Sequence, residues 1–135
     1  MRVGRHGTVT AEFALMLTGL LLLLSGIVEA GRYFLTLGSV RTATADAARL
    51  AVIRGSANMV AGNAPCAGLS GSLAPATFGA PAIIAQQLSA TLSGCTTTGG
   101  VTRVTVTLSY AYGRMLPLVP LGPARISDST VAVFY

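Results

Sequence analysis

The sequence Arg-His-Gly-Thr-Val-Thr-Ala-Glu-Phe at residues 5–13 runs directly into the apolar segment ALMLTGLLLLLSGIV at residues 14–28. Between Val9 and Val28 there are 20 residues, and Glu12 is the only charged one. An α-helix rises about 1.5 Å per residue, so about 20 apolar residues cross a bilayer core about 30 Å thick. This stretch therefore predicts one transmembrane helix over residues 9–28.

The charges on either side of the apolar segment predict its orientation. Arg2 and Arg5 precede the segment, whereas Glu29 and Arg32 follow it. Positively charged residues are enriched on the cytoplasmic side of membrane helices. We therefore expect a cytoplasmic N-terminus and an extracytoplasmic C-terminal part.

Glu12 is an unusual residue for a simple membrane anchor. A carboxylate near the middle of a membrane helix costs roughly 2.5–3.5 kcal/mol on insertion scales, and less toward the ends. We expect Glu12 to have a partner, and its own N-terminus and the lipid head groups are two candidates. The alternative is that Glu12 is tolerated because it lies within one turn of the interface.

The spacing of Gly7, Glu12 and Phe13 resembles a prepilin processing site, because Glu12 and Phe13 are the fifth and sixth residues after the glycine. Over residues 5–54 the chain resembles the TadE/TadG-like minor pseudopilins of the tight-adherence (Tad or Flp) type IV pilus system. The resemblance is weaker over the C-terminal third and absent in between.

This resemblance implies a bacterial inner-membrane protein that a prepilin peptidase cleaves between Gly7 and Thr8. It also implies that Glu12 pairs with the new α-amine of Thr8 on a neighbouring pilin or pseudopilin subunit, which sets the register of assembly. The aromatic Phe13 completes the motif.

Composition excludes several other classes of protein. The formal net charge is +5, but the basic residues are scattered arginines and form no patch interleaved with aromatic residues. Nucleic acid is therefore not an expected partner. His6 is the only histidine and would be lost with the leader, so we expect no metal site, cofactor, small-molecule substrate or catalytic residue.

Residues 8–54 are predicted to form one long helix that continues beyond the membrane. Glu29 and Arg32 are i,i+3 neighbours at the water boundary and are expected to pair. Gly55 is expected to end the helix. A small-residue stripe recurs every fourth position within it, at Ala43, Ala47 and Ala51. The stripe is either a helix filler or a contact face for neighbouring helices.

Residues 55–100 are rich in Gly, Ala, Ser, Pro and Thr and are predicted to be mainly loop, with one helical piece at residues 81–89. Cys66 and Cys95 both follow the membrane helix, where the compartment is oxidising, so they predict a disulfide. The bond would close a loop of about 30 residues and contribute roughly 3–4 kcal/mol by the chain-entropy model. The alternative is two buried free thiols.

Two strands are predicted near the C-terminus. Residues 101–112 alternate, with Val104, Val106, Leu108 and Tyr110 on one face, and Gly113 ends the strand. A Pro-rich excursion follows at residues 114–123, and residues 126–135 return as a second strand with Val131, Val133 and Tyr135 in alternation. Two strands alone are marginally stable, so we expect them to pack on the outer half of the long helix.

The sequence therefore predicts an α+β, pilin-like fold with three parts: a basic leader at residues 1–7, the helix at residues 8–54 and a small extracytoplasmic domain at residues 55–135. The main functional hypothesis is a non-enzymatic minor pseudopilin that enters a pilus or primes its base. Two alternatives remain. One is a secreted protein cut after Ala30, and the other is an unprocessed single-span protein whose outer domain binds an envelope partner.

Overall fold

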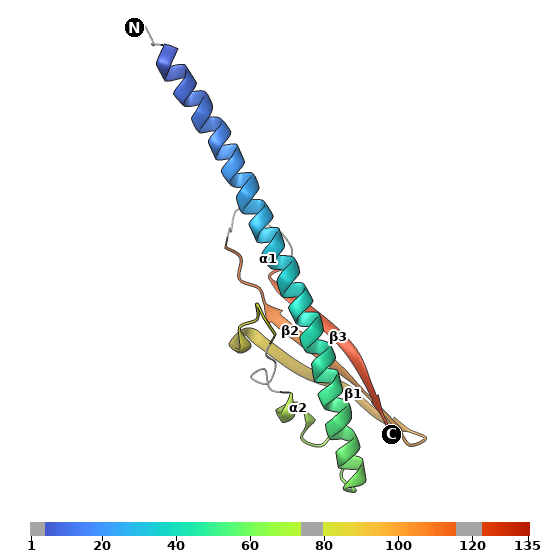
Figure 1. Ribbon diagram of the computed structural model, residues 1–135. Coiled ribbons are helices and arrows are strands. Elements are labelled where there is room, and N and C mark those ends of the chain that lie inside the picture. Colours follow the sequence, from blue (N-terminus) through green and yellow to red (C-terminus); the bar gives the residue numbers. More distant parts are fainter. Residues whose placement is uncertain (1–4, 74–79, 116–122) are drawn as a thin grey trace.

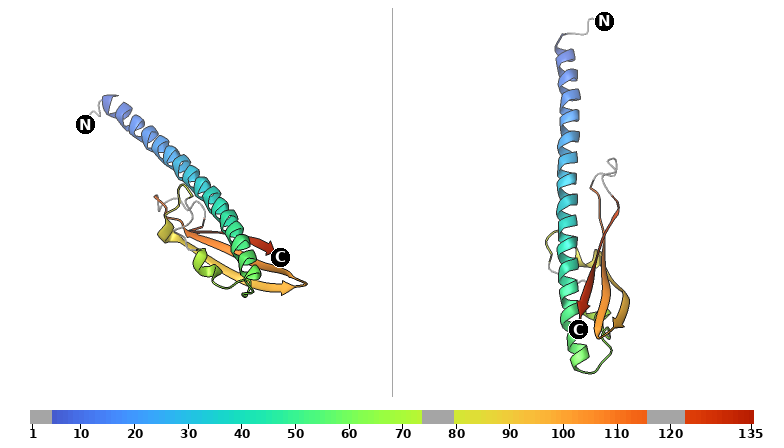
Figure 2. Two further views of the ribbon diagram at one scale, coloured as in Figure 1. Left: turned by 60° about the horizontal axis from the view of Figure 1, so that its bottom comes forward. Right: turned by 90° about the vertical axis from the view of Figure 1, so that its right-hand side faces the viewer.

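The computed structural model describes residues 5–73, 80–115 and 123–135, with side chains from residue 9 onward. One long helix lies against a three-stranded antiparallel sheet (Figures 1 and 2). The sheet covers only the C-terminal half of the helix, and the N-terminal half extends away from it. The predicted α+β architecture is confirmed.

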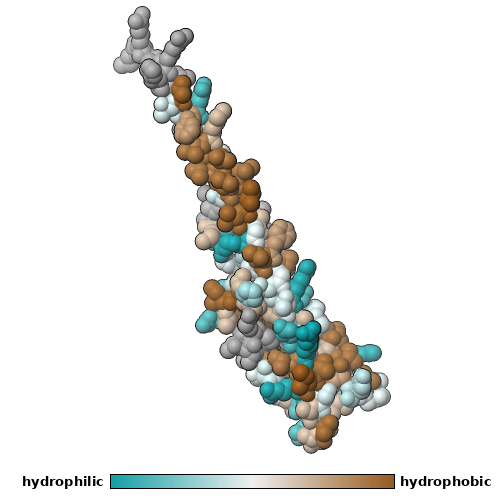
Figure 3. Space-filling view, in the orientation of Figure 1, coloured by the Kyte–Doolittle hydropathy of each residue, from teal (hydrophilic) through white to brown (hydrophobic). Residues whose placement is uncertain are grey.

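Helix α1 runs from Arg5 to Val60. Its first half is apolar on all sides and exposed, as Leu15, Met16 and Leu23 illustrate with 79%, 76% and 61% of their surface accessible. Apolar side chains cover this half in Figure 3. The hydroxyl of Thr18 donates a hydrogen bond of 2.8 Å to the carbonyl oxygen of Ala14, so this polar group is satisfied within the helix. In the described part of the chain, α1 is the one helix long and apolar enough to cross a membrane.

Helix α1 ends at Val60, beyond the stop that the sequence predicts at Gly55. Gly55 is buried inside the helix, and a Cβ atom there would overlap the ring of Phe134. The glycine is therefore needed for the close approach of strand and helix and does not act as a C-cap.

The sheet has the order β1-β2-β3, with β1 at Leu88–Thr98, β2 at Val101–Ala111 and β3 at Arg125–Phe134. The two strands that the sequence predicts correspond to β2 and β3. The predicted helical piece at residues 81–89 is wrong: a 3₁₀ turn at Ala85–Gln87 leads directly into β1.

Strand β1 is held by a tight hairpin with β2. Thr98 pairs with Val101, and the two loop residues Gly99 and Gly100 have φ of 58° and 80°. Positive φ at both central residues is typical of the type I′ hairpin turn, and glycine adopts it at little cost. The Gly-Gly pair and the alternation of Leu88, Ala90 and Leu92 were the available signals for this strand.

The inner face of the sheet is set by register. Val104, Val106, Leu108 and Tyr110 of β2 are buried, as predicted. Strand β3 pairs Ala132 with Val104 and Phe134 with Thr102, so the alternating Val131, Val133 and Tyr135 lie on the outer, exposed face. Both faces of β3 carry apolar residues, so the sequence alone leaves the choice of face open, and pairing with β2 decides it.

The small-residue stripe of α1 packs inside this chain. Ala43, Ala47 and Ala51 are at most 1% exposed and belong to the core formed with β2 and β3. These alanines are therefore covered by the chain's own sheet and are not available as a contact face for neighbouring helices. Their small side chains allow the sheet to approach the helix backbone.

Cys66 and Cys95 form a disulfide across a sequence separation of 29 residues. Cys95 lies in a bulge of β1, where the register with β2 shifts between Ser93 and Thr96. The bond joins β1 to the segment between α1 and the short helix α2 at Leu69–Ser72. The side-chain amide of Asn58 donates to the carbonyl oxygens of Pro65 and Ala67, at 3.2 and 2.9 Å, and holds the same segment against the end of α1.

Some sequence predictions fall outside the described residues. These are the first part of the leader, at residues 1–4, and most of the Pro-rich excursion, at residues 116–122.

Replacing Gly55 with alanine should destabilise the folded domain by about 1–3 kcal/mol, because the added methyl group has no space beside Phe134. Gly38→Ala is the matched control, since nothing lies within 4 Å of a Cβ at that helical position. The control should be neutral or stabilising by up to about 1 kcal/mol. Urea unfolding of the detergent-solubilised chain measures both, and equal stability of the two variants would contradict the packing argument.

Candidate functional site

Two regions of α1 carry the residues of functional interest. The first is the exposed apolar half with Glu12 and Phe13. The second lies where α1 meets the sheet, and we call Glu29, Arg32, Tyr112 and Met115 the boundary cluster.

The predicted processing motif lies at the start of α1. Gly7 and Thr8 fall within its first turns, and Glu12 follows Thr8 by four residues, or about 6 Å along the axis. Glu12 is exposed, and 65% of the surface of Phe13 is accessible. Ion pairs in the described part of the chain include Glu29–Arg32 and Asp46–Arg49, and Glu12 forms none there.

Glu29 is the opposite case, because it is only 2% exposed. Its Oε1 accepts a hydrogen bond of 2.9 Å from the Tyr112 hydroxyl, and its Oε2 accepts one of 3.4 Å from the backbone N–H of Met115. Arg32 Nη1 lies 3.5 Å from Oε2. Burying a carboxylate is costly unless it is paired and hydrogen-bonded, and here both oxygens have donors.

The predicted ion pair of Glu29 with Arg32 is thus present, but the sequence did not predict the partners from the end of β2. Tyr112 and Met115 lie 83 and 86 residues further along the chain than Glu29. No local spacing links them to Glu29. Tyr112 and Met115 come close to Glu29 only because the antiparallel sheet packs along the helix.

Tyr112 is held on two sides. Its ring meets that of Tyr33 edge to face, with centroids 5.6 Å apart. Burial raises the pKa of its hydroxyl above 10.0, and the hydrogen bond to Glu29 and the negative charge of that carboxylate act in the same direction. Tyr112 therefore remains a neutral hydrogen-bond donor to Glu29 at physiological pH.

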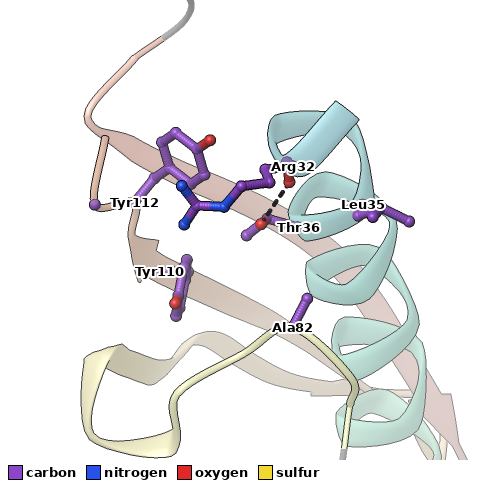
Figure 4. A pocket seen from close by; sticks show the side chains of 7 residues that line it. Arg32, Leu35, Thr36, Ala82, Tyr110 and Tyr112 are labelled. Carbon is purple, nitrogen blue, oxygen red and sulfur yellow. Dashed lines mark hydrogen bonds between the residues drawn. The ribbon is translucent and has the colours of Figure 1, made fainter. Parts of the chain in front are cut away.

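A cavity of about 200 Å³ lies beside the boundary cluster, between α1 and the end of β2. Figure 4 shows the Arg32 guanidinium extending from α1 into the space between Tyr110 and Tyr112. A second, more apolar cavity of about 310 Å³ lies on the apolar side of Glu29, lined by Leu21, Leu24, Ser25, Val28 and Met115.

Among the residues that the structure describes, no three His, Cys, Asp or Glu side chains come together as a metal site. Both cysteines are in the disulfide.

Ala30, after which a signal peptidase would cut in the secretory alternative, lies in the interior of α1. Cleavage there would separate Glu29 from the domain whose Tyr112 donates to it. The hydroxyl of Tyr112 and the N–H of Met115 would then lose their acceptor.

Replacing Tyr112 with phenylalanine should remove the last phase of tyrosinate formation in an alkaline absorbance titration. The folded chain holds the Tyr112 proton more tightly than the unfolded chain. The resulting stabilisation is complete below the unfolded pKa of about 10 and is lost as the pH rises through the higher folded pKa. Tyr135→Phe, at an 88% exposed position, is the control. A last phase that persists without Tyr112 would contradict this assignment.

Comparison with known proteins gives one family. Residues 7–49 match the family model described as TadE-like protein. No curated protein and no solved structure gives a significant match to the chain. The matched residues begin at Gly7 and end within α1, so the sheet lies outside the match. Residues 7–49 are therefore a TadE-like protein domain, of the family of minor pilin-like proteins of the Tad pilus.

Proposed function

We propose that this protein is a minor pseudopilin of a Tad-type pilus. In this proposal the chain is inserted once in the bacterial inner membrane, with a cytoplasmic N-terminus. A prepilin peptidase cleaves it between Gly7 and Thr8, and the mature subunit joins the pilus or its base through other pilin subunits. The TadE-like domain at residues 7–49 supports an association with the Tad system.

The observation that carries the proposal is the division of α1 into two halves. The half from Val40 to Ala51 is covered by the sheet of the same chain, whereas the half from Val9 to Val28 is uncovered and apolar. An apolar helix of this length is stable in a bilayer or among similar helices, and not in water. A subunit that moves from a membrane into a fibre needs a helix suited to both environments.

Glu12 supplies the specificity that an apolar helix lacks. Cleavage after Gly7 would leave a positively charged α-amine on Thr8, one helical turn before the Glu12 carboxylate. Opposite charges attract more strongly in a low-dielectric environment, and each lowers the burial penalty of the other. Pairing of Glu12 with the amine of an adjacent subunit would fix one axial register. Pairing within one subunit would neutralise the carboxylate without setting a register.

The secretory alternative is less well supported. Release after Ala30 would discard Glu29, which is 2% exposed and hydrogen-bonded to the sheet domain. It would also leave a soluble domain without the residue that its Tyr112 hydroxyl contacts.

Changing Gly7 to leucine should abolish processing, because the peptidase must accommodate the residue before the cleaved bond. Mass and N-terminal sequence of the chain purified from its own membrane provide the measurement. Wild-type protein should begin at Thr8, and Gly7→Leu should retain Met1. Gly4→Leu, within the same leader, is the control and should be processed normally. A wild-type chain that begins at Gly31 would overturn the proposal.

Changing Glu12 to glutamine should leave processing intact but lower incorporation into pili by roughly tenfold or more, since an unpaired charge would remain in a desolvated site. Immunoblots of sheared pili, compared with whole cells, measure incorporation. Asp46→Asn removes an exposed carboxylate further along the same helix and should have little effect. Normal incorporation of the Glu12→Gln subunit would exclude a register role for Glu12.

A further inference from the structure

We propose that the boundary cluster and the helix face next to it bind one membrane phospholipid. The lipid phosphate would contact Arg32, and an acyl chain would lie against Leu21, Leu24 and Met115. This inference rests on the membrane insertion in the proposed function, but not on pilus assembly.

The polar half of the site is the cavity of about 200 Å³ between α1 and the end of β2. Arg32, Thr36, Tyr110 and Tyr112 line it, and the Arg32 guanidinium extends into it in Figure 4. About 40% of the Arg32 side chain is exposed, so a ligand can reach it. Its Nη1 atom is buried and has no hydrogen-bond partner among the described residues. Glu29 therefore does not saturate the guanidinium at Nη1, and a ligand can contact the exposed part of the Arg32 side chain.

Glu29 does not satisfy the hydrogen-bonding capacity of the Arg32 guanidinium. Its oxygens already accept hydrogen bonds from the Tyr112 hydroxyl and the Met115 N–H, and Arg32 lies 3.5 Å away without completing a hydrogen bond. Glu29 therefore leaves part of the hydrogen-bonding capacity of Arg32 unfilled, and an anion can fill it. Guanidinium and phosphate form paired, charge-assisted hydrogen bonds.

The apolar half of the site is the cavity of about 310 Å³ lined by Leu21, Leu24, Ser25, Val28, Glu29 and Met115. These helix positions are three or four residues apart, so they lie on one face of α1, and Arg32 continues the same face. From Leu21 to Arg32 the helix rises about 16 Å, which is comparable to the length of a lipid acyl chain.

The position of the site selects a lipid over other anions. Arg32 lies one helical turn beyond Val28, where the predicted membrane span ends and the head-group layer begins. Phosphodiester groups are the abundant anions of that layer, and each carries apolar chains that extend toward Leu21. A site with an exposed cation on the water side and an apolar cavity on the membrane side matches both parts of that molecule.

Native mass spectrometry of the full chain, extracted from nanodiscs, tests this inference. The probes are phosphatidylglycerol, diacylglycerol with the same acyl chains, and water-soluble glycerol phosphate. Wild-type protein should retain phosphatidylglycerol, and Arg32→Gln should retain roughly tenfold less, because a charged hydrogen-bond donor is lost. Arg41→Gln, at an exposed position of the same helix, is the matched control and should behave as wild type.

A second variant separates loss of binding from a disturbed fold. Leu35 lines the polar cavity and is 67% exposed, so Leu35→Glu adds a negative charge there without touching Glu29. It should also lower retention of phosphatidylglycerol. Equal retention by wild type, Arg32→Gln and Leu35→Glu would overturn the inference.

The other outcomes are equally decisive. Equal binding of diacylglycerol would exclude recognition of the phosphate, and equal competition by glycerol phosphate would exclude the acyl-chain cavity. A dimer that depends on Arg32 and excludes lipid would assign the site to a second copy of the chain. A chain that never enters the nanodisc would instead refute the membrane insertion of the proposed function.

Discussion

The contact between the sheet and the alanine face of α1 is the interaction on which the rest of the structure depends. The face of the three-stranded sheet that carries Val104, Val106 and Leu108 is apolar and needs a partner. Helix α1 supplies it through Ala43, Ala47 and Ala51, which are almost fully buried, and through Gly55, which admits the ring of Phe134. Because these side chains are small, the strands lie close to the helix backbone. This packing also fixes the position of the strands along the helix axis.

The position of the sheet along the helix axis determines which residues of α1 the end of β2 contacts. Tyr112 and Met115 arrive at Glu29, one residue beyond the apolar segment, and supply hydrogen bonds to both of its oxygens. The Glu29 carboxylate thus lies where the uncovered half of α1 meets the folded domain, and it binds the two together through these hydrogen bonds. The two carboxylates of α1 that lie near the apolar segment therefore differ in role: Glu29 is satisfied within the chain, whereas Glu12 is exposed and has no cation from the described part of the chain.

The two halves of α1 therefore differ in the kind of contact that they can make. The part of α1 that carries Glu12 is apolar and uncovered, and in the proposed function it contacts membrane lipid or other helices. The part beyond Glu29 is built for contacts within it, where the disulfide between Cys66 and Cys95 further ties β1 to the end of the helix. The TadE-like match covers the first part and the beginning of the second. The proposed lipid site lies at their junction, because polar and apolar surfaces adjoin there.

The sequence by itself determined the long apolar helix and strand β2, since each is encoded by a local run or a strict alternation. The spacing of Gly7, Glu12 and Phe13 is local too, and processing at Gly7 stays a prediction. The sequence also indicated the disulfide, because both cysteines follow the apolar segment that is predicted to cross the membrane. Only the tertiary structure decided the rest. Strand β1, rich in Gly, Ser and Thr, is defined by pairing with β2. The exposed face of β3 follows from its register with β2. The alanine stripe is buried because the chain's own sheet covers it. The bonds from Tyr112 and Met115 to Glu29 join residues more than 80 positions apart, which no local pattern records.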